Sequence, residues 1–142
     1  MSTPNGNIWA GSGSPKAMQV IDRFYSLLDA ETPEAAKEMS QMCTEDAVFI
    51  TPGQTFKGRQ EIYTQRLGFW EAFPGLRHQP LRVYVSPSSP LDVVVVNSAT
   101  FPTKDGVGTS YTAANWTLAE SNGAYLVRKL ELFLNPAAFG WT

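Results

Sequence analysis

One acidic residue stands inside the last apolar run of the sequence. Glu131 follows Leu130 and precedes Leu132, Phe133 and Leu134. An ionised carboxylate is costly to bury among apolar side chains. Either this run therefore exposes one face to water, or the acid lies in a pocket and does chemistry there, because acids in unusual surroundings gather at functional sites.

Three other side chains are candidates for the same chemistry. If Tyr111 and Asn115 share a cavity with Glu131, they supply a phenol, an amide and a carboxylate, which suffices for proton transfer to a carbonyl-containing substrate without a cofactor. His78 is the only imidazole in the chain, and imidazole exchanges protons readily near neutral pH. It is a second candidate acid/base. The competing interpretation is an exposed histidine beside Arg77.

Four residues are candidates for contact with a substrate. Tyr25 would offer a phenol from the first helix, although Phe24 fits the apolar stripe of that helix better. Thr51 would offer a hydroxyl at a cavity mouth, or is a simple strand residue before a turn. Trp70 is expected in the core or in a cavity wall.

Composition excludes several classes of protein. The chain has 142 residues, a net charge of -2 and no long block of either sign, whereas a nucleic-acid binder needs a basic stripe. No apolar run approaches the roughly 20 residues that span a bilayer. One cysteine, Cys43, and one histidine make neither a disulfide nor a zinc cage. We therefore expect no metal or cofactor, no nucleic-acid or membrane partner, and a cytoplasmic location.

The pattern of the chain predicts one domain. Residues 1–13 have linker composition and form an expected flexible arm, which packs at most through Ile8 and Trp9, and residues 14–142 form the domain with a short tail. Proline follows a capping residue at Ser14 and at Thr32, which predicts two helix starts. Further segments are a hairpin at 47–51 and 55–57, a helix at 58–73, and strands at 76–85, 91–101, 107–119 and 124–134.

These elements predict an α+β fold. Three helices would pack on the concave face of a curved antiparallel sheet and enclose a conical cavity. Cavities of this kind commonly hold small ligands. Strand alternation leaves open which face of residues 111–118 lines the cavity: the set with Tyr111 and Asn115, or the more apolar set with Trp116.

Four strings of the sequence stand out together: RFYSLLDA at 23–30, TEDAVF at 44–49, FKGRQEI at 56–62, and ANWTL at 114–118 before the Asn-Gly of 122–123. In combination they resemble the nuclear transport factor 2-like superfamily, above all its SnoaL-like polyketide cyclase and isomerase branch. The resemblance covers roughly residues 15–135. It implies a carboxylate in the final strand, which falls on Glu131, and a polar partner in the strand before it, which falls on Asn115.

Other branches of this superfamily fit less well. The residues that similar ketosteroid isomerases use would fall on Thr51, Phe24 and Ala114, none of which has the required acid or donor, and this argues against steroid isomerisation. No match is found to the Asp-Arg-Asp set of limonene epoxide hydrolase relatives.

Two hypotheses follow. The first is a cofactor-independent isomerase or cyclase, with dehydration also possible, acting on a small, largely apolar, carbonyl-bearing metabolite of secondary metabolism through Glu131. The second is a non-catalytic module of the same fold that binds a ligand or dimerises. The resemblance also implies a homodimer.

Overall fold

The structure is a computed structural model and describes residues 6–9 and 14–135. The rest of the expected arm and the expected tail lie outside the described residues. The described residues form four helices and six strands, in the order α1 Gly6–Trp9, α2 Pro15–Leu28, α3 Pro33–Gln41, β1 Cys43–Thr51, β2 Gln54–Lys57, α4 Gly58–Ala72, β3 Arg77–Ser86, β4 Ser89–Thr103, β5 Gly106–Ser121 and β6 Ala124–Phe133.

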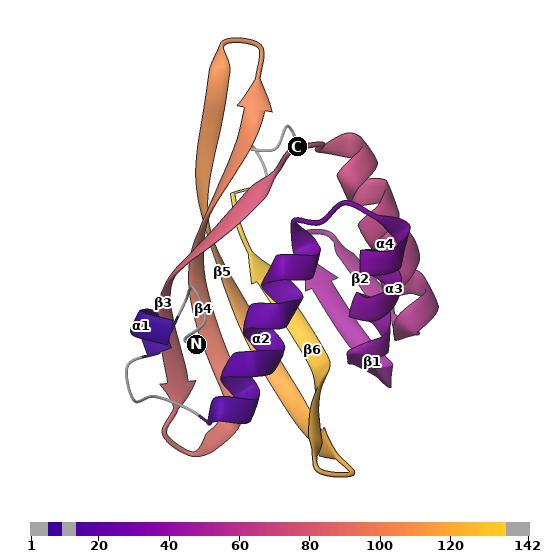
Figure 1. Cartoon of the computed structure of the whole chain (residues 1–142), viewed down its shortest axis with the longest axis vertical. Helices are drawn as coiled ribbons and strands as arrows, with labels where there is room; N and C mark the ends of the chain where they lie inside the picture. Colours follow the sequence, from indigo (N-terminus) through magenta and orange to yellow (C-terminus); the bar gives the residue numbers. More distant parts are fainter. Residues whose placement is uncertain (1–5, 10–13, 136–142) are drawn as a thin grey trace.

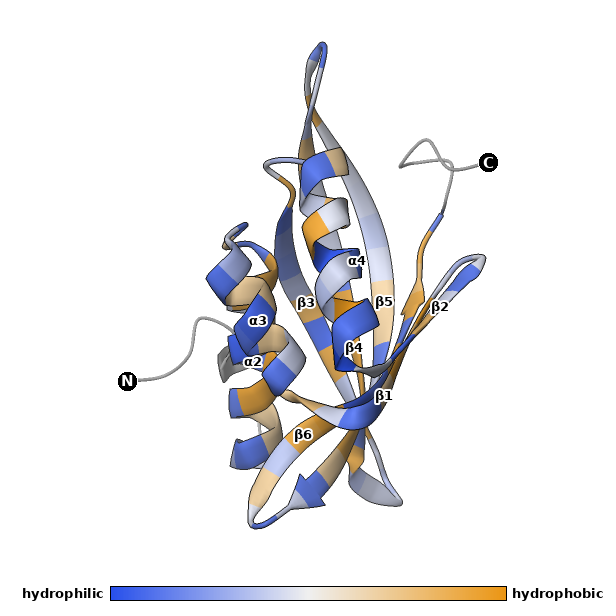
Figure 2. Ribbon diagram, turned by 90° about the vertical axis from the view of Figure 1, so that its right-hand side faces the viewer, coloured by the Kyte–Doolittle hydropathy of each residue, from blue (hydrophilic) through white to orange (hydrophobic). Residues whose placement is uncertain are grey.

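The six strands form one curved sheet in the order β2-β1-β6-β5-β4-β3. Helices α2, α3 and α4 lie on one side of it (Figures 1 and 2). The predicted α+β architecture is confirmed. The sheet is mixed, however, and not wholly antiparallel, because β1 runs parallel to β6.

Both predicted proline-led helix starts are present. The hydroxyl of Ser14 accepts a hydrogen bond from the backbone N–H of Ala17 at 3.0 Å, and that of Thr32 accepts one from Ala35 at 3.1 Å. Each cap satisfies a backbone donor that has no partner inside the helix. The two caps thus fix where α2 and α3 begin.

The core lies between the helices and the concave face of the sheet. On β5 the apolar set faces this core: Trp116 is 1% exposed and packs edge-on against Phe24 of α2, with ring centroids 5.0 Å apart. Trp9 of the short helix α1 is also buried in this core. The set with Tyr111 and Asn115 therefore covers the convex face of the sheet.

Strands β4 and β5 form a long hairpin whose tip extends beyond the helices (Figure 1). The shorter β5–β6 hairpin turns at Asn122 and Gly123, which both have positive φ, as two-residue turns of this kind require. In the described part of the chain no helix is long and apolar enough to cross a membrane.

Candidate active site

A cavity of about 600 Å³ opens between α4, the β1–β2 hairpin, β6 and the start of β3. Its size is typical of small-molecule sites. Most of the wall is apolar and aromatic, and the polar side chains that reach it come from five residues: Thr51, Gln54, Gln65, Arg66 and His78.

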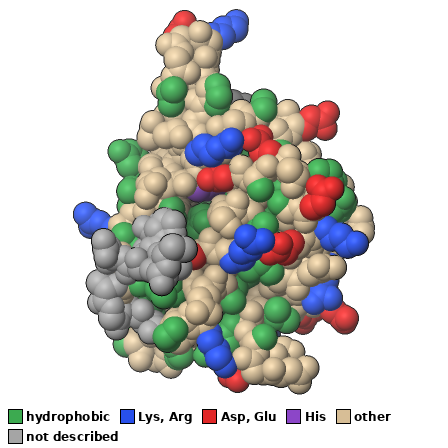
Figure 3. All heavy atoms as spheres, viewed as in Figure 1, with side chains coloured by type: hydrophobic (Ala, Val, Ile, Leu, Met, Phe, Trp, Pro, Cys, Tyr) green, Lys and Arg blue, Asp and Glu red, His purple; other side chains and the backbone are tan. Residues whose placement is uncertain are grey.

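His78 is held at this wall by Asp29. Its ring atom Nδ1 lies 2.8 Å from Asp29 Oδ1, and its backbone N–H donates to Asp29 Oδ2 at 3.0 Å. A carboxylate only accepts hydrogen bonds, so Nδ1 carries the proton and Nε2 is left as the basic atom. The imidazole side chain is 16% exposed, and little of it is visible in Figure 3, where it is purple.

The end of α2 brings Asp29 to this position. The helix ends at Leu28 and Asp29 is its C-cap, so the carboxylate projects from the loop that leads to α3. Farther along the chain, Gly75 forms a turn with a φ of +80° just before β3 begins. Only glycine adopts such a φ without strain, and the turn aligns the first residues of β3 with the α2–α3 loop.

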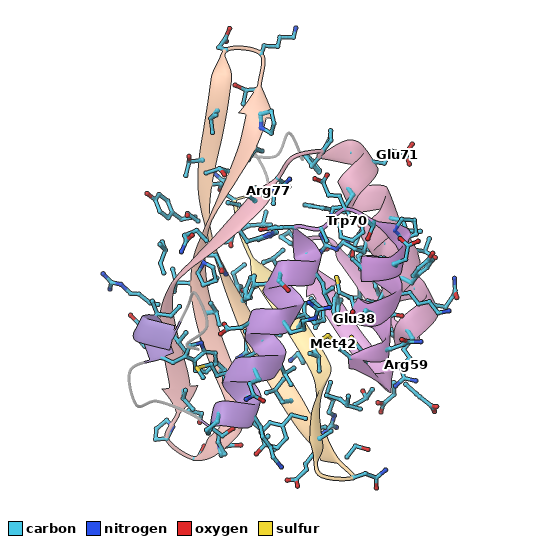
Figure 4. All side chains as sticks on the ribbon, in the orientation of Figure 1. Glu38, Met42, Arg59, Trp70, Glu71 and Arg77 are labelled. Atoms are coloured by element: carbon cyan, nitrogen blue, oxygen red, sulfur yellow. The ribbon has the colours of Figure 1, made fainter. Side chains whose placement is uncertain are left out.

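Glu31 fastens the same two segments together. Its carboxylate accepts hydrogen bonds from the Gly75 backbone N–H at 3.0 Å and from Arg77 Nη1 at 2.9 Å. Arg77 lies at the beginning of β3 in Figure 4. The hydrogen bond from Gly75, together with Arg77, lowers the pKa of Glu31 below its ordinary value. Asp29 and Glu31 thus hold the strand segment that carries His78.

Arg66 contributes a buried positive charge to the cavity. It is 8% exposed, and its guanidinium lies 4.7 Å from the ring centroid of Phe69 and 5.8 Å from that of Trp70. Nε and Nη1 are buried without a hydrogen-bond partner. Burial lowers the pKa of Arg66 to about 10, against the opposing attraction of Asp29, so the side chain is charged at neutral pH.

Tyr25 supports the histidine from the core side. Its ring centroid lies 5.9 Å from that of His78, and its hydroxyl accepts a hydrogen bond from Asn97 Nδ2 at 2.8 Å. Burial raises the pKa of Tyr25 above its ordinary value. The phenol therefore stays neutral and packs against the imidazole.

Residues 21–121 match the sequence profile of the SnoaL-like domain. The chain belongs to this family. Among solved structures, a candidate scytalone dehydratase from Novosphingobium aromaticivorans has a TM-score of 0.66 at 18% identity, over 84% of this chain and 82% of that one. No curated protein matches the sequence.

Two further structures are similar. An NTF2-like protein of unknown function from Exiguobacterium sp. 255-15 has a TM-score of 0.68 at 17% identity, over 82% of this chain and 98% of that one. Nuclear transport factor 2 from Cryptosporidium parvum has the same score and identity, over 87% and 98%. At these identities the likeness shows a shared NTF2-like fold.

In this SnoaL-like chain, the expected placement of Glu131, Asn115 and Tyr111 in the cavity is wrong. Asn115 of β5 is paired with Glu131 of β6, and the next pair is Trp116 with Leu130. Adjacent pairs point to opposite faces of a sheet. Leu130 lines the cavity, so Glu131 and Asn115 lie on the convex face.

The surroundings of these three residues agree with that placement. Lys129 Nζ lies 3.6 Å from Glu131 Oε1, and Asn115 Nδ2 donates to Asp92 Oδ1 at 2.8 Å. Tyr111 is 70% exposed. Of the two alternatives for Glu131, the structure shows the run that exposes one face to water, with Lys129 as the neighbour of the carboxylate.

The remaining candidates divide between the cavity and the core. His78 and Thr51 line the cavity. Phe24 and Tyr25 are buried and do not reach it. Trp70 is buried as well and donates from Nε1 to the Leu28 carbonyl at 2.7 Å, which joins α4 to the end of α2 (Figure 4).

Sequence reasoning missed Asp29 and Arg66. The signal for Arg66 was present: Ile62, Arg66 and Trp70 are spaced by four, and these are the buried residues of α4. A charged residue inside an apolar stripe is an informative exception. Asp29 follows the apolar stripe of α2, but nothing local indicates that His78, 49 residues later, would be its partner.

In the part of the chain that the structure describes, neither a candidate metal site nor a reactive thiol accompanies these groups. Within residues 6–9 and 14–135, no cluster of His, Cys, Asp and Glu is suited to hold a metal ion. Cys43 is fully buried, and burial raises the pKa of its thiol to about 12. Among the described residues of the cavity wall, His78 is the one whose side-chain type suits proton transfer.

Proposed function

We propose that this SnoaL-like chain is a cofactor-independent isomerase or cyclase that moves protons on a small, largely apolar, carbonyl-bearing metabolite of secondary metabolism. One observation carries the proposal: the Asp29–His78 pair at the wall of an aromatic cavity of about 600 Å³. A carboxylate that orients an imidazole is a recurrent arrangement of general base catalysis.

The proposed step begins at His78 Nε2. This atom removes a proton from the carbon next to the substrate carbonyl, and the imidazolium that forms is stabilised by Asp29 at Nδ1. The electron pair of the broken C–H bond forms the C=C bond of an enolate while the carbonyl π pair moves onto oxygen, and the imidazolium then returns the proton at another position. Isomerisation, aldol-type ring closure and loss of a β-hydroxyl all share this first step.

The experiment that tests the proposal follows the shared step and needs no knowledge of the final product. A panel of aromatic ketones and β-dicarbonyl compounds is incubated with the protein in D₂O, and exchange at the carbon next to the carbonyl is followed by proton NMR. We expect catalysed exchange with the wild type and a rate lower by on the order of 10²–10⁴ in H78Q, the range typical of a lost general base.

Glu131→Gln is the matched control, because it removes a carboxylate from the opposite face of the sheet. We expect E131Q to exchange at the wild-type rate. Wild-type exchange in H78Q, or its loss in E131Q, contradicts the proposal.

The alternative is a module of the same fold that binds a ligand without transforming it. The concave, largely apolar cavity favours ligand binding under either function. Binding of a panel compound without any exchange, in the wild type as in H78Q, is the result that favours the alternative.

We also propose that two copies of the chain pair through the convex face. Tyr84, Tyr111 and Phe133 are exposed there by 54%, 70% and 54%, and large exposed aromatic side chains are typical of association surfaces. In this assembly Glu131 and Asn115 contribute to association and not to proton transfer.

A further inference from the structure

We infer that the cavity selects a substrate that carries a single carboxylate, and that Arg66 binds this carboxylate. The inference rests on the proposed function, since it names the class of molecule that the same cavity takes. It adds a specificity residue on α4, opposite in charge to the group it recognises.

The state of the Arg66 guanidinium is the first argument. A buried charge is costly unless hydrogen bonds compensate it, yet two of its nitrogens, Nε and Nη1, are buried without a partner. The rings of Phe69 and Trp70 pack against it. Rings stabilise the charge but leave these N–H groups unsatisfied.

The position of Arg66 is the second argument. The side chain is nine-tenths buried and lines the cavity together with Gln65 and His78. Unpaired guanidinium N–H groups match the two oxygens of a carboxylate, which accepts them side by side. A ligand carboxylate would therefore supply the hydrogen-bond acceptors that Arg66 Nε and Nη1 lack within the protein.

Charge balance is the third argument and limits the ligand to one negative charge. Among the described residues of the cavity wall, Arg66 is the only Lys or Arg, which is too little for a phosphate dianion. Asp29 attracts Arg66 from a distance, but its oxygens accept hydrogen bonds from His78 and none from Arg66. The Nε and Nη1 donors of the guanidinium are thus available to a ligand.

The remaining wall determines the rest of the molecule. Aromatic and aliphatic side chains dominate it, namely Phe49, Phe56, Phe69, Phe73, Leu130 and Leu132. Such a wall favours a flat apolar body. An aromatic or polyunsaturated keto acid, with its carboxylate at Arg66 and its reacting carbon near His78, meets both requirements.

The test compares two ligands of nearly equal shape. Binding of 2-naphthoate and of its neutral counterpart 2-naphthamide is measured by calorimetry at neutral pH. We expect the wild type to bind the acid about tenfold more tightly, the scale of one charge-assisted hydrogen-bond pair. Arg66→Gln should bring the ratio of the two dissociation constants to about one.

Controls separate this effect from general changes. Arg128→Gln removes an exposed arginine that does not line the cavity, and it should keep the wild-type preference. If R66Q does not fold, the Nε–H resonance of Arg66 in the wild type replaces it: this resonance should shift with 2-naphthoate and not with 2-naphthamide.

The inference and the proposed function fail in different ways. Three results would each overturn the carboxylate site. The wild type could bind acid and amide equally, or R66Q could keep the preference for the acid. In the third, the Arg66 Nε–H resonance does not shift up to the solubility limit of 2-naphthoate. H78Q should keep the preference while losing proton exchange. Absence of exchange in the wild type with the preference intact overturns only the proposed catalysis.

Discussion

Asp29 binds both the backbone and the ring of His78, so one carboxylate fixes the position and the protonated ring nitrogen of the imidazole. Position and tautomer are separate requirements of a general base. Replacing the carboxylate by an amide keeps the size of the side chain and disturbs both. A substitution at Asp29 therefore tests the proposed role of His78 directly.

We predict that Asp29→Asn lowers the rate of proton exchange far more than it weakens substrate binding. An amide nitrogen cannot accept the His78 N–H and can donate to Nδ1, which moves the ring proton to Nε2 and removes the base. The expected loss in kcat is on the order of 10²–10⁴, with KM nearly unchanged. Steady-state kinetics of an exchanging ketone measures both constants.

Asp105→Asn is the matched control, since it makes the same change in an exposed turn at the tip of the β4–β5 hairpin. It should behave as the wild type. A D29N protein that exchanges protons at the normal rate would show that Asp29 only supports the fold.

At the scale of elements, local signals in the sequence sufficed for much of the architecture. The Ser14-Pro15 and Thr32-Pro33 pairs predicted the starts of α2 and α3, and both caps are present. The Asn122-Gly123 turn separated β5 from β6. These features depend on neighbours in the chain, which is why the sequence alone reveals them.

The placement of the site depended on contacts that no local pattern contains. The register that pairs Asn115 with Glu131 joins two strands, and the β5–β6 ladder is irregular after Thr117, so alternation along β6 alone does not assign faces. The Asp29–His78 contact joins a helix end to a strand start. Only the assembled fold shows that His78 lies at the cavity wall with Asp29 as its partner.

The junction between the α2–α3 loop and the start of β3 gives a prediction of pH dependence. Glu31→Gln should lower the free energy of unfolding at neutral pH by about 1 kcal/mol, because the charge-assisted contact with Arg77 is lost. Glu31 has a lower pKa in the folded than in the unfolded protein. Its contribution is therefore complete above the ordinary Glu pKa and disappears as the pH falls through the folded value.

Urea denaturation at several pH values between about 7 and about 3 measures this difference. Wild type and E31Q should differ at the upper end and converge at the lower end. Glu71→Gln, on the exposed outer side of α4 (Figure 4), should match the wild type throughout. A gap between wild type and E31Q that is independent of pH would mean that the ion pair contributes nothing.

At the scale of the molecule, the convex face is the surface left uncovered by the helices. Tyr84, Val94, Asn115 and Glu131 are paired in register across four adjacent strands and so form one row on this face. Lys129 and Glu131 place both signs of charge on the same face as exposed Tyr111 and Phe133. A two-fold axis through such a surface can bring each charge opposite its complement on a second copy.

We predict that Tyr111→Glu separates the proposed dimer, since a charged carboxylate would replace an exposed aromatic side chain of the proposed pairing surface. The dissociation constant should rise about 30-fold or more, the cost typical of a lost aromatic anchor residue. Size-exclusion chromatography with light scattering over a dilution series measures it.

Gln19→Glu, on the exposed side of α2, adds the same charge away from this surface and should leave the mass of two chains. A wild type with the mass of one chain at every concentration contradicts the pairing, whereas the Asp29–His78 pair, held within one chain, should keep its exchange activity in monomeric Y111E.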